Sequence, residues 1–217
     1  PMAVMVGMGR GARAGVLVKN AEALELMEKT DTLVLDKTGT LTEGRPVLAA
    51  VHAAAGIEES RLVALAASLE RASEHALASA ILAGAEQRGL RLFDSGHFTS
   101  LTGMGVQGTV DGHEVAVGNA RLLEQLKIDA GPLPERAEAL ELEGQTVAYV
   151  AIDRAPAGLL GVLDPIRPSA AEAIAELHRE KLRIVMLTGD SRRTAGIVAR
   201  RLGIDEVIAE VSPDQKG

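Results

Sequence analysis

Apolar segments alternate with polar turns near both ends of the chain. Residues 32–36 form a β-prone run that ends in Asp36, and residues 182–187 form a second apolar run followed by a polar turn. A segment with helical spacing then covers residues 191–202, and residues 206–209 predict a short third strand. Strands that alternate with helices in this way predict a parallel sheet.

The middle of the chain has a different pattern. Two helices are predicted within residues 58–89, and Asp111-Gly112 separates two short alternating runs, the usual signal for a β-hairpin. Further elements are predicted as helices at 120–126 and 135–143, and as strands at 147–152 and 159–163. We therefore predict an α+β insert with an antiparallel sheet, placed between two halves of a parallel-sheet domain.

This pattern gives the fold class α/β, with one domain split in sequence by another. The predicted boundaries are residues 1–45 and 158–217 for the parallel-sheet domain and residues 46–157 for the insert. Asn20 predicts the N-cap of a helix that ends near Lys29, just before the first strand.

Composition narrows the possible functions. The 217 residues are 47% hydrophobic but only 1% aromatic, so a core must be built from aliphatic side chains. A net charge of −7 argues against a nucleic-acid partner, and the absence of cysteine excludes disulfides and thiolate metal sites. No apolar run reaches the roughly 18–20 residues that span a bilayer, which predicts a soluble, cytosolic chain when it is taken alone.

Candidate chemistry lies where two predicted strands end. Asp36 opens a turn rich in glycine and threonine, and residues 188–190 (Thr-Gly-Asp) follow the second strand. Ligands bind at the carboxyl edge of open parallel sheets, and such turns offer N–H and hydroxyl groups to phosphate oxygens. Taken one at a time, each segment is equally compatible with an ordinary capping turn.

The complete run Asp36-Lys37-Thr38-Gly39-Thr40-Leu41-Thr42 is far more specific. It resembles the phosphorylation motif of the P-type ATPases, ion pumps with a haloacid-dehalogenase-like phosphorylation domain. The resemblance implies that Asp36 is a nucleophile that becomes phosphorylated, and that its carboxylate and the Thr38 carbonyl bind Mg²⁺. Thr38 stands where phosphatases of the wider superfamily carry a second Asp as acid/base, so the phosphoaspartate should hydrolyse slowly.

Two further motifs fit the same family. Thr188-Gly189-Asp190 resembles its second motif, which implies that the Thr188 hydroxyl binds the phosphoryl group and that Asp190 orients nucleotide and Mg²⁺. Lys216 resembles the lysine of the third motif, which neutralises charge on phosphoryl oxygens; alone, it would read as an exposed terminal lysine.

The motif that follows in the family, Gly-Asp-Gly-x-Asn-Asp, supplies a further carboxylate for Mg²⁺, and it does not occur before Gly217. We therefore expect this chain to bind ATP but to phosphorylate itself poorly or not at all.

Scattered residues of the insert are similar to the adenine pocket of heavy-metal pumps. Glycines let backbone approach a flat ring, a histidine can stack on it or bond to its edge, and a glutamate can accept a hydrogen bond from the amino group. Without this resemblance, His75 reads as a structural or surface residue of a helix. Ala76 replaces the proline that the family carries after this histidine, which puts the orientation of His75 in question. The predicted ATP-binding residues are Glu70, His75, Gly103, Gly105, Gly118 and Asn119.

These resemblances together identify the chain as the ATP-binding and phosphorylation region of a heavy-metal-transporting P-type ATPase. Residues 1–19 are similar to the copper(I) branch, and residues 1–9 read as the cytosolic end of a transmembrane helix. The implied partners are ATP, Mg²⁺ and the transmembrane domain of the same pump, on the cytoplasmic face of a membrane, with Cu(I) bound elsewhere. Two alternatives remain: a soluble phosphatase of the superfamily with a large cap domain, and a non-catalytic nucleotide-binding module.

Overall fold

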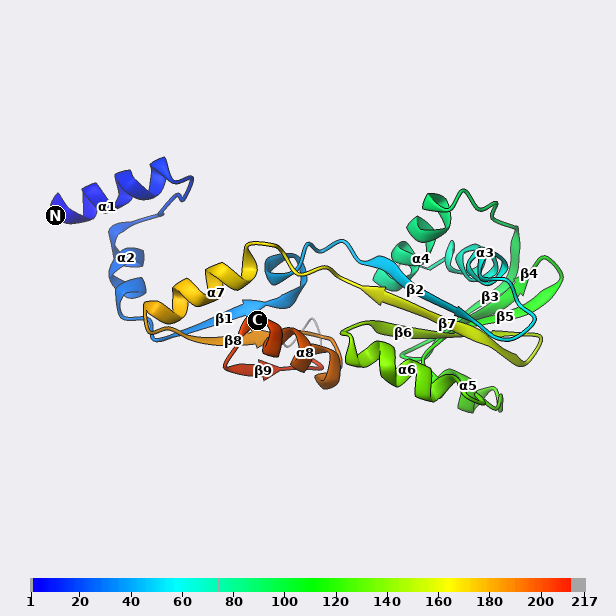
Figure 1. Ribbon diagram of the computed structural model, residues 1–217. Coiled ribbons are helices and arrows are strands. Elements are labelled where there is room, and N and C mark those ends of the chain that lie inside the picture. The colour runs from blue at the N-terminus through cyan, green and yellow to red at the C-terminus, as the bar shows by residue number, and fades with distance from the viewer. Residues whose placement is uncertain (1, 74, 212–217) are drawn as a thin grey trace.

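The computed structural model describes residues 2–73 and 75–211, which form two lobes around two separate sheets (Figure 1). One sheet has three parallel strands in the order β1-β8-β9, and the other has six antiparallel strands in the order β2-β7-β6-β5-β4-β3. This confirms the predicted combination of a parallel sheet and an antiparallel α+β insert.

The small-sheet lobe contains β1, β8 and β9 with the helices α7 and α8. Its elements are β1 (Thr32–Asp36), α7 (Ala170–Arg179), β8 (Arg183–Leu187), α8 (Arg192–Leu202) and β9 (Glu206–Ile208). Both helices share one aliphatic core with the sheet, which includes Leu41, Ile174, Ile184 and Met186. Helix α8 ends at Gly203, whose positive φ of 73° suits a left-handed C-cap.

The large-sheet lobe contains the antiparallel sheet and four helices. Its strands are β2 (Val47–Ala53), β3 (Ser95–Leu101), β4 (Gly105–Val110), β5 (His113–Gly118), β6 (Thr146–Ile152) and β7 (Ala155–Leu163). Its helices are α3 (Glu59–Glu70), α4 (Ala76–Gln87), α5 (Ala120–Gln125) and α6 (Leu133–Leu142). Strand β2 was not predicted, because its alanine-rich sequence carries little β signal.

Helices cover both faces of this sheet, α3 and α4 on one and α5 and α6 on the other (Figure 1). Each face has an aliphatic core: Leu65 and Ile81 pack with Val117 on the first, and Leu122 packs with Leu159 on the second. Two such cores explain how a chain with almost no aromatic residues still forms a stable lobe.

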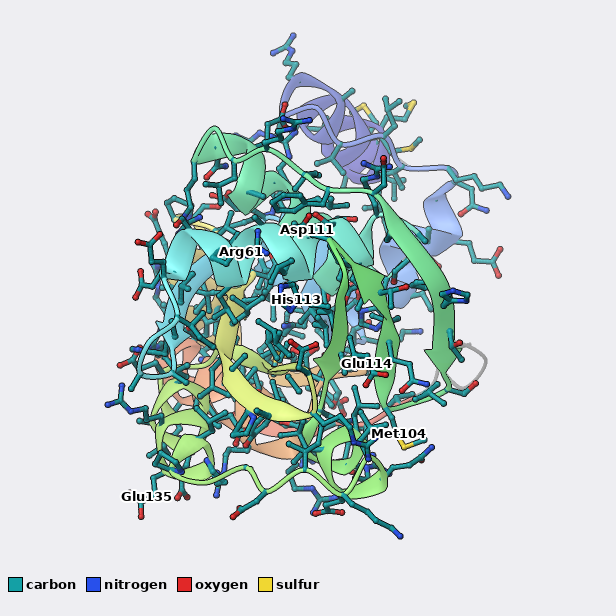
Figure 2. All side chains as sticks on the ribbon, turned by 90° about the vertical axis from the view of Figure 1, so that its right-hand side faces the viewer. Arg61, Met104, Asp111, His113, Glu114 and Glu135 are labelled. Atoms are coloured by element: carbon teal, nitrogen blue, oxygen red, sulfur yellow. The ribbon has the colours of Figure 1, made fainter. Side chains whose placement is uncertain are left out.

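The predicted hairpin is confirmed. Val110 pairs with His113, and Asp111 and Gly112 both have positive φ, as a two-residue turn of this kind requires. Figure 2 shows Arg61 of α3 beside Asp111, with the guanidinium 2.8 Å from the carboxylate and 5.0 Å from the centre of the Phe93 ring. These contacts fasten the hairpin to α3.

The chain passes between the lobes twice, through residues 42–46 and again after Leu163. Strand β7 pairs with β2 and β6 over its whole length, so the expected boundary at residues 157–158 falls inside a strand of the large sheet. We propose that the domains divide instead at residues 42–46 and 164–167, where neither sheet continues.

The first residues form two short helices, α1 (Met2–Arg13) and α2 (Ala21–Glu28), that bury no residue. The predicted cap of α2 is confirmed, since the Asn20 side chain accepts a hydrogen bond from the Ala23 amide at 2.9 Å. Met2 and Met5 of α1 are largely exposed. Across the part of the chain that the structure describes, no helix combines the length and apolar character needed to cross a bilayer.

A contact between His178 of α7 and Asp205, the residue before β9, gives a test of this lobe. The Asp205 carboxylate accepts the Ile184 amide at 2.7 Å and lies 3.0 Å from the His178 ring, and these bonds lower the pKa of Asp205 below its ordinary value of 3.8. Because its pKa is lowered in the folded state, the Asp205 carboxylate stabilises the fold above pH 3.8, and that contribution is lost as the pH falls below this value.

We expect Asp205→Asn to lower the melting temperature at pH 7, and the difference in melting temperature from wild type to shrink toward pH 3. Equal melting temperatures at pH 7 would contradict this assignment.

Candidate functional site

Two strand ends carrying the predicted phosphorylation residues lie side by side. Asp36 at the end of β1 is paired in register with Leu187 at the end of β8, so Thr188 continues the chain next to Asp36. Asp36 is half-buried, and Thr188 is buried at 1% exposure. The Thr188 hydroxyl accepts the Asp190 amide at 3.1 Å, which holds the turn that follows β8. The parallel sheet therefore brings these two motifs to one edge.

A wide turn, η1 (Lys37–Leu41), follows Asp36. The Thr42 amide closes it by donating to the Lys37 carbonyl at 3.1 Å, and Gly39 has a positive φ of 78°. Thr38 is exposed on this turn, whereas Lys37 is 6% exposed and forms an ion pair with Asp190. The first two motifs are thus joined by an ion pair between the buried Lys37 and the partly exposed Asp190, and removing Asp190 would leave the Lys37 charge buried without this partner, which is costly.

The same turn is connected to the second crossing between the lobes. The Thr42 hydroxyl donates to the Asp164 carboxylate at 2.6 Å, and the Arg45 amide donates to that carboxylate at 3.2 Å. Arg167 donates from its guanidinium to the Gly39 carbonyl at 3.0 Å. Residues 164–167 therefore brace the second crossing against the turn that follows Asp36.

The six residues predicted to bind ATP line one pocket of about 310 Å³ in the large-sheet lobe. They come from the end of α3, the start of α4, the β3–β4 turn and the junction of β5 with α5. The start of β6, residues 146–148, completes the wall. Segments far apart in sequence are therefore gathered into one cavity, as the resemblance implied.

Glu70 is the most telling residue of this pocket. Its side chain is 3% exposed, and its Oε2 atom has no hydrogen-bond partner within the described structure. Burial raises the pKa of the Glu70 carboxyl above 4.5, and a hydrogen bond with Ser73 acts against that shift. A buried polar atom without a partner is unusual in a folded protein and fits a group that completes its bonding with a ligand.

His75 and Asn119 cap the two helices that open at the pocket. The sequence suggested that His75 lies within a helix. It lies instead at the N-cap of α4, where its Nδ1 atom accepts the Leu77 amide at 3.2 Å. Ala76 takes the first position of α4, which proline also favours, so the backbone there is helical without proline. Asn119 caps α5 and donates to the Gly103 carbonyl at 2.9 Å.

The glycines of the pocket are required for two different physical reasons. Gly105 and Gly118 are paired across β4 and β5, and a Cβ atom on Gly118 would lie 2.2 Å from the Met104 carbonyl oxygen. These two glycines allow close packing of the protein with itself. Only Gly103, with a positive φ of 71° and open space at its Cβ position, fits the expected approach to a ring.

A second pocket, of about 460 Å³, lies elsewhere on the large sheet. Its lining includes Gln107, Thr109, Glu114 and Arg154, and none of the predicted site residues. Figure 2 labels Glu114 in this pocket and Met104 in the smaller one. We propose the smaller pocket as the nucleotide site, because it holds the buried Glu70 Oε2 atom, which has no hydrogen-bond partner among the described residues.

Of the two remaining predicted residues, the described structure includes Gly189 but not Lys216. Gly189 is exposed beside Thr188, while Lys216 lies outside the described residues, so its place relative to Asp36 stays a prediction. No cluster of three or more His, Asp or Glu side chains suited to a metal ion occurs in the described ranges. The Asp36 carboxylate and the Thr38 carbonyl oxygen are nonetheless hard donors of the type that Mg²⁺ prefers.

Comparison with known proteins gives a consistent result. Residues 30–217 match the family of haloacid dehalogenase-like hydrolases. The chain is 53% identical over its full length to a copper-transporting P-type ATPase of Rhizobium leguminosarum bv. viciae, and 44% identical to a silver exporting P-type ATPase of Salmonella typhimurium. It covers 26% of each of those proteins, so it spans about a quarter of their length.

Solved structures agree with these relatives. A zinc-transporting PIB-type ATPase in the E2.Pi state matches 99% of this chain with a TM-score of 0.80 and 36% identity, over 34% of that protein. The catalytic domain of the CPx-ATPase CopB-B matches 96% of this chain with a TM-score of 0.69 and 26% identity, over 73% of that domain.

The paired glycines give a test of how the pocket is built. In Gly118→Ala the new Cβ atom meets the Met104 carbonyl and Gly105, so we expect a loss of about 1–3 kcal/mol in the free energy of unfolding, measured with urea. Gly103→Ala is the matched control, because it adds only the strain of a positive φ, about 1 kcal/mol. A Gly118→Ala protein as stable as wild type would show that the close packing of β4 on β5 is not needed.

Proposed function

Because the chain belongs to the haloacid dehalogenase-like hydrolases, we propose that it is the ATP-binding and phosphorylation region of a heavy-metal-transporting P-type ATPase. The observation that supports this most is the register of β1 with β8, which brings Asp36 and Thr188 to one sheet edge. In this proposal ATP binds in the large-sheet lobe, and its γ-phosphoryl group is transferred to the Asp36 carboxylate.

The pocket of the large-sheet lobe would hold the adenine ring. The buried Oε2 atom of Glu70, which has no hydrogen-bond partner among the described residues, accepts a hydrogen bond from the exocyclic amino group. His75 is exposed at the pocket and is fixed through Nδ1, so its ring is available to stack on the base or to bond to its edge. Gly103 provides the open backbone face over the ring.

At the sheet edge, one oxygen of Asp36 attacks the γ-phosphorus, and the bond from that phosphorus to the β,γ-bridging oxygen breaks, with ADP as leaving group. The Thr188 hydroxyl donates to a phosphoryl oxygen. Lys37 is engaged with Asp190, which keeps the carboxylate of Asp190 oriented beside the site. Lys216 supplies positive charge to the same oxygens.

The Asp36 carboxylate and the Thr38 carbonyl oxygen would hold Mg²⁺, which screens the charge between phosphate and carboxylate. Thr38 has no basic group near neutral pH, so nothing at this position activates water against the phosphoaspartate. This favours a pump over the rival function, a soluble phosphatase with a large cap, and the rival would instead turn over small phosphoesters rapidly.

In the whole protein, phosphorylation of Asp36 would drive transport through a transmembrane domain, with the residues described here on the cytoplasmic side. The similarity to copper and silver exporters favours a soft monovalent cation, most simply Cu(I), bound in that membrane domain.

The present orientation of the lobes favours a step before or after phosphoryl transfer. Among the described residues, the ATP pocket is lined by the large-sheet lobe alone, with no contribution from the strand ends at Asp36 and Thr188. A pump solved in the E2.Pi state matches 99% of this chain over 34% of its own length, and this similarity supports the same view. Transfer would then need a hinge rotation at residues 42–46 and 164–167.

Asp36→Asn separates the two lobes' roles. In the complete pump we expect it to abolish acid-stable labelling from γ-³²P-ATP, because an amide does not accept the phosphoryl group. In this chain, calorimetric affinity for ATP should change by less than about twofold, since the pocket lies in the other lobe. An affinity that collapses in Asp36→Asn would refute this division of labour.

The ionisation of Glu70 gives a second test. The carboxylate form accepts a hydrogen bond from adenine, so lowering the pH through the raised pKa of Glu70, above 4.5, should weaken ATP binding. In Glu70→Gln an amide oxygen still accepts but does not titrate, so the part of the pH dependence that belongs to Glu70 should disappear. Identical pH profiles for the two proteins would remove Glu70 from the adenine site.

A further inference from the structure

A charged contact joins the two lobes away from the hinge. Helices α6 and α8 form the most extensive contact between lobes among the described helices and strands. In it, the Arg193 guanidinium lies 3.0 Å from the Glu138 carboxylate and 3.0 Å from the Glu141 carboxylate. Arg201 donates to the Glu143 carbonyl at 3.2 Å. One arginine on the small-sheet lobe is thus held by two carboxylates of the large-sheet lobe.

Arg193 is placed against the local preference of its helix. It lies in the first turn of α8, which contains no acidic residue, and a positive charge there opposes the helix dipole. Among the described residues, the carboxylates that compensate this unfavourable placement are Glu138 and Glu141, which belong to the other lobe. A residue that is poorly suited to its own helix and well suited to a distant one indicates that the contact between lobes matters.

Arg193 is also close in the chain to the phosphorylation site. Helix α8 begins directly after the Thr188-Gly189-Asp190 turn, and Asp190 pairs with Lys37, the neighbour of Asp36. On the other side of the contact, α6 leads through residues 143–145 into the start of β6, which lines the ATP pocket. The contact therefore lies between the elements that carry the two halves of the reaction.

We propose that Arg193 is a positioning residue, which through Glu138 and Glu141 holds the lobes in the separated orientation and must release α6 before ATP reaches Asp36. The claim that release of α6 lets ATP reach Asp36 rests on the proposed function. The claim that Arg193 holds the orientation of the two lobes does not. All three side chains are partly exposed, with 37–57% of their surface accessible, so the hold is weak enough for nucleotide to break. It is also weakened by salt.

The distance between the lobes tests the hold directly. The chain contains no cysteine, so Gln125→Cys on α5 and Ala173→Cys on α7, both exposed positions, take two spin labels and no others. Pulsed electron spin resonance without nucleotide then gives the distribution of distances between the lobes. We expect one narrow population in the parent protein and a broader or shifted one in Arg193→Glu, where the charges repel.

Matched variants decide whether the ion pairs are responsible. Arg192→Glu makes the same charge change in the same turn of α8, at an exposed residue for which the described structure shows no ion pair, and it should leave the distribution narrow. Exchanging the charges, with Arg193→Glu, Glu138→Arg and Glu141→Arg together, should restore it. If Arg193→Glu keeps the parent distribution, or if Arg192→Glu broadens it equally, the proposal is wrong.

Phosphorylation of the complete pump tests the functional part. In Arg193→Ala, the ATP concentration for half-maximal phosphoenzyme should fall by about two- to fivefold, the size that two exposed ion pairs support. The maximal phosphoenzyme level should not change. A broadened distance distribution with unchanged phosphorylation would reject Arg193 as a positioning residue while leaving Asp36 as the acceptor. Absence of any phosphoenzyme in the parent pump would instead reject the proposed function.

Discussion

Parallel pairing of β1 with β8 is the constraint on which the candidate site depends. The pairing sets Asp36 against Leu187, so the two polar turns that follow must leave the sheet at the same edge. The ion pair between the buried Lys37 and the partly exposed Asp190 then fixes one turn against the other. In the proposed function neither motif alone has a geometry for phosphoryl transfer, and a shift of this register would separate Asp36, the proposed nucleophile, from the Thr188 hydroxyl.

The second constraint is the separation of binding from chemistry. The large-sheet lobe builds its pocket from four junctions of its own elements, with the Glu70 Oε2 atom in its lining, while the proposed acceptor Asp36 belongs to the other lobe. The two are connected by a hinge in which Thr42 and Arg45 bond to Asp164, and by the contact of Arg193 with α6. Under the proposed function, a covalent intermediate would persist in such a design, because the large-sheet lobe would move away after transfer.

Sequence reasoning predicted those features that local chemistry determines. The strand ends at Asp36 and Thr188, the Asp111-Gly112 hairpin and the Asn20 cap all follow from short patterns, and the structure confirms them. It failed where distant partners decide the outcome. Strand β2 is held by pairing with β7, more than a hundred residues later, and His75, which the sequence placed on one of the two helices predicted within residues 58–89, caps the second of them instead. The partners of Arg193 lie more than fifty residues away, so no local pattern reveals them. The clustering of the six pocket residues was predicted only through resemblance.

Locating the modified atom is the most direct test of this account. The complete pump, incubated with ATP and Mg²⁺ and then treated with borohydride, has any acyl phosphate reduced to an alcohol, which converts a phosphorylated aspartate into homoserine. Peptide mass spectrometry should find homoserine at position 36 and at no other aspartate, and only when ATP was present. Homoserine at a different aspartate, or a phosphorylated pump whose residue 36 remains aspartate, would contradict the claim that Asp36 accepts the phosphoryl group.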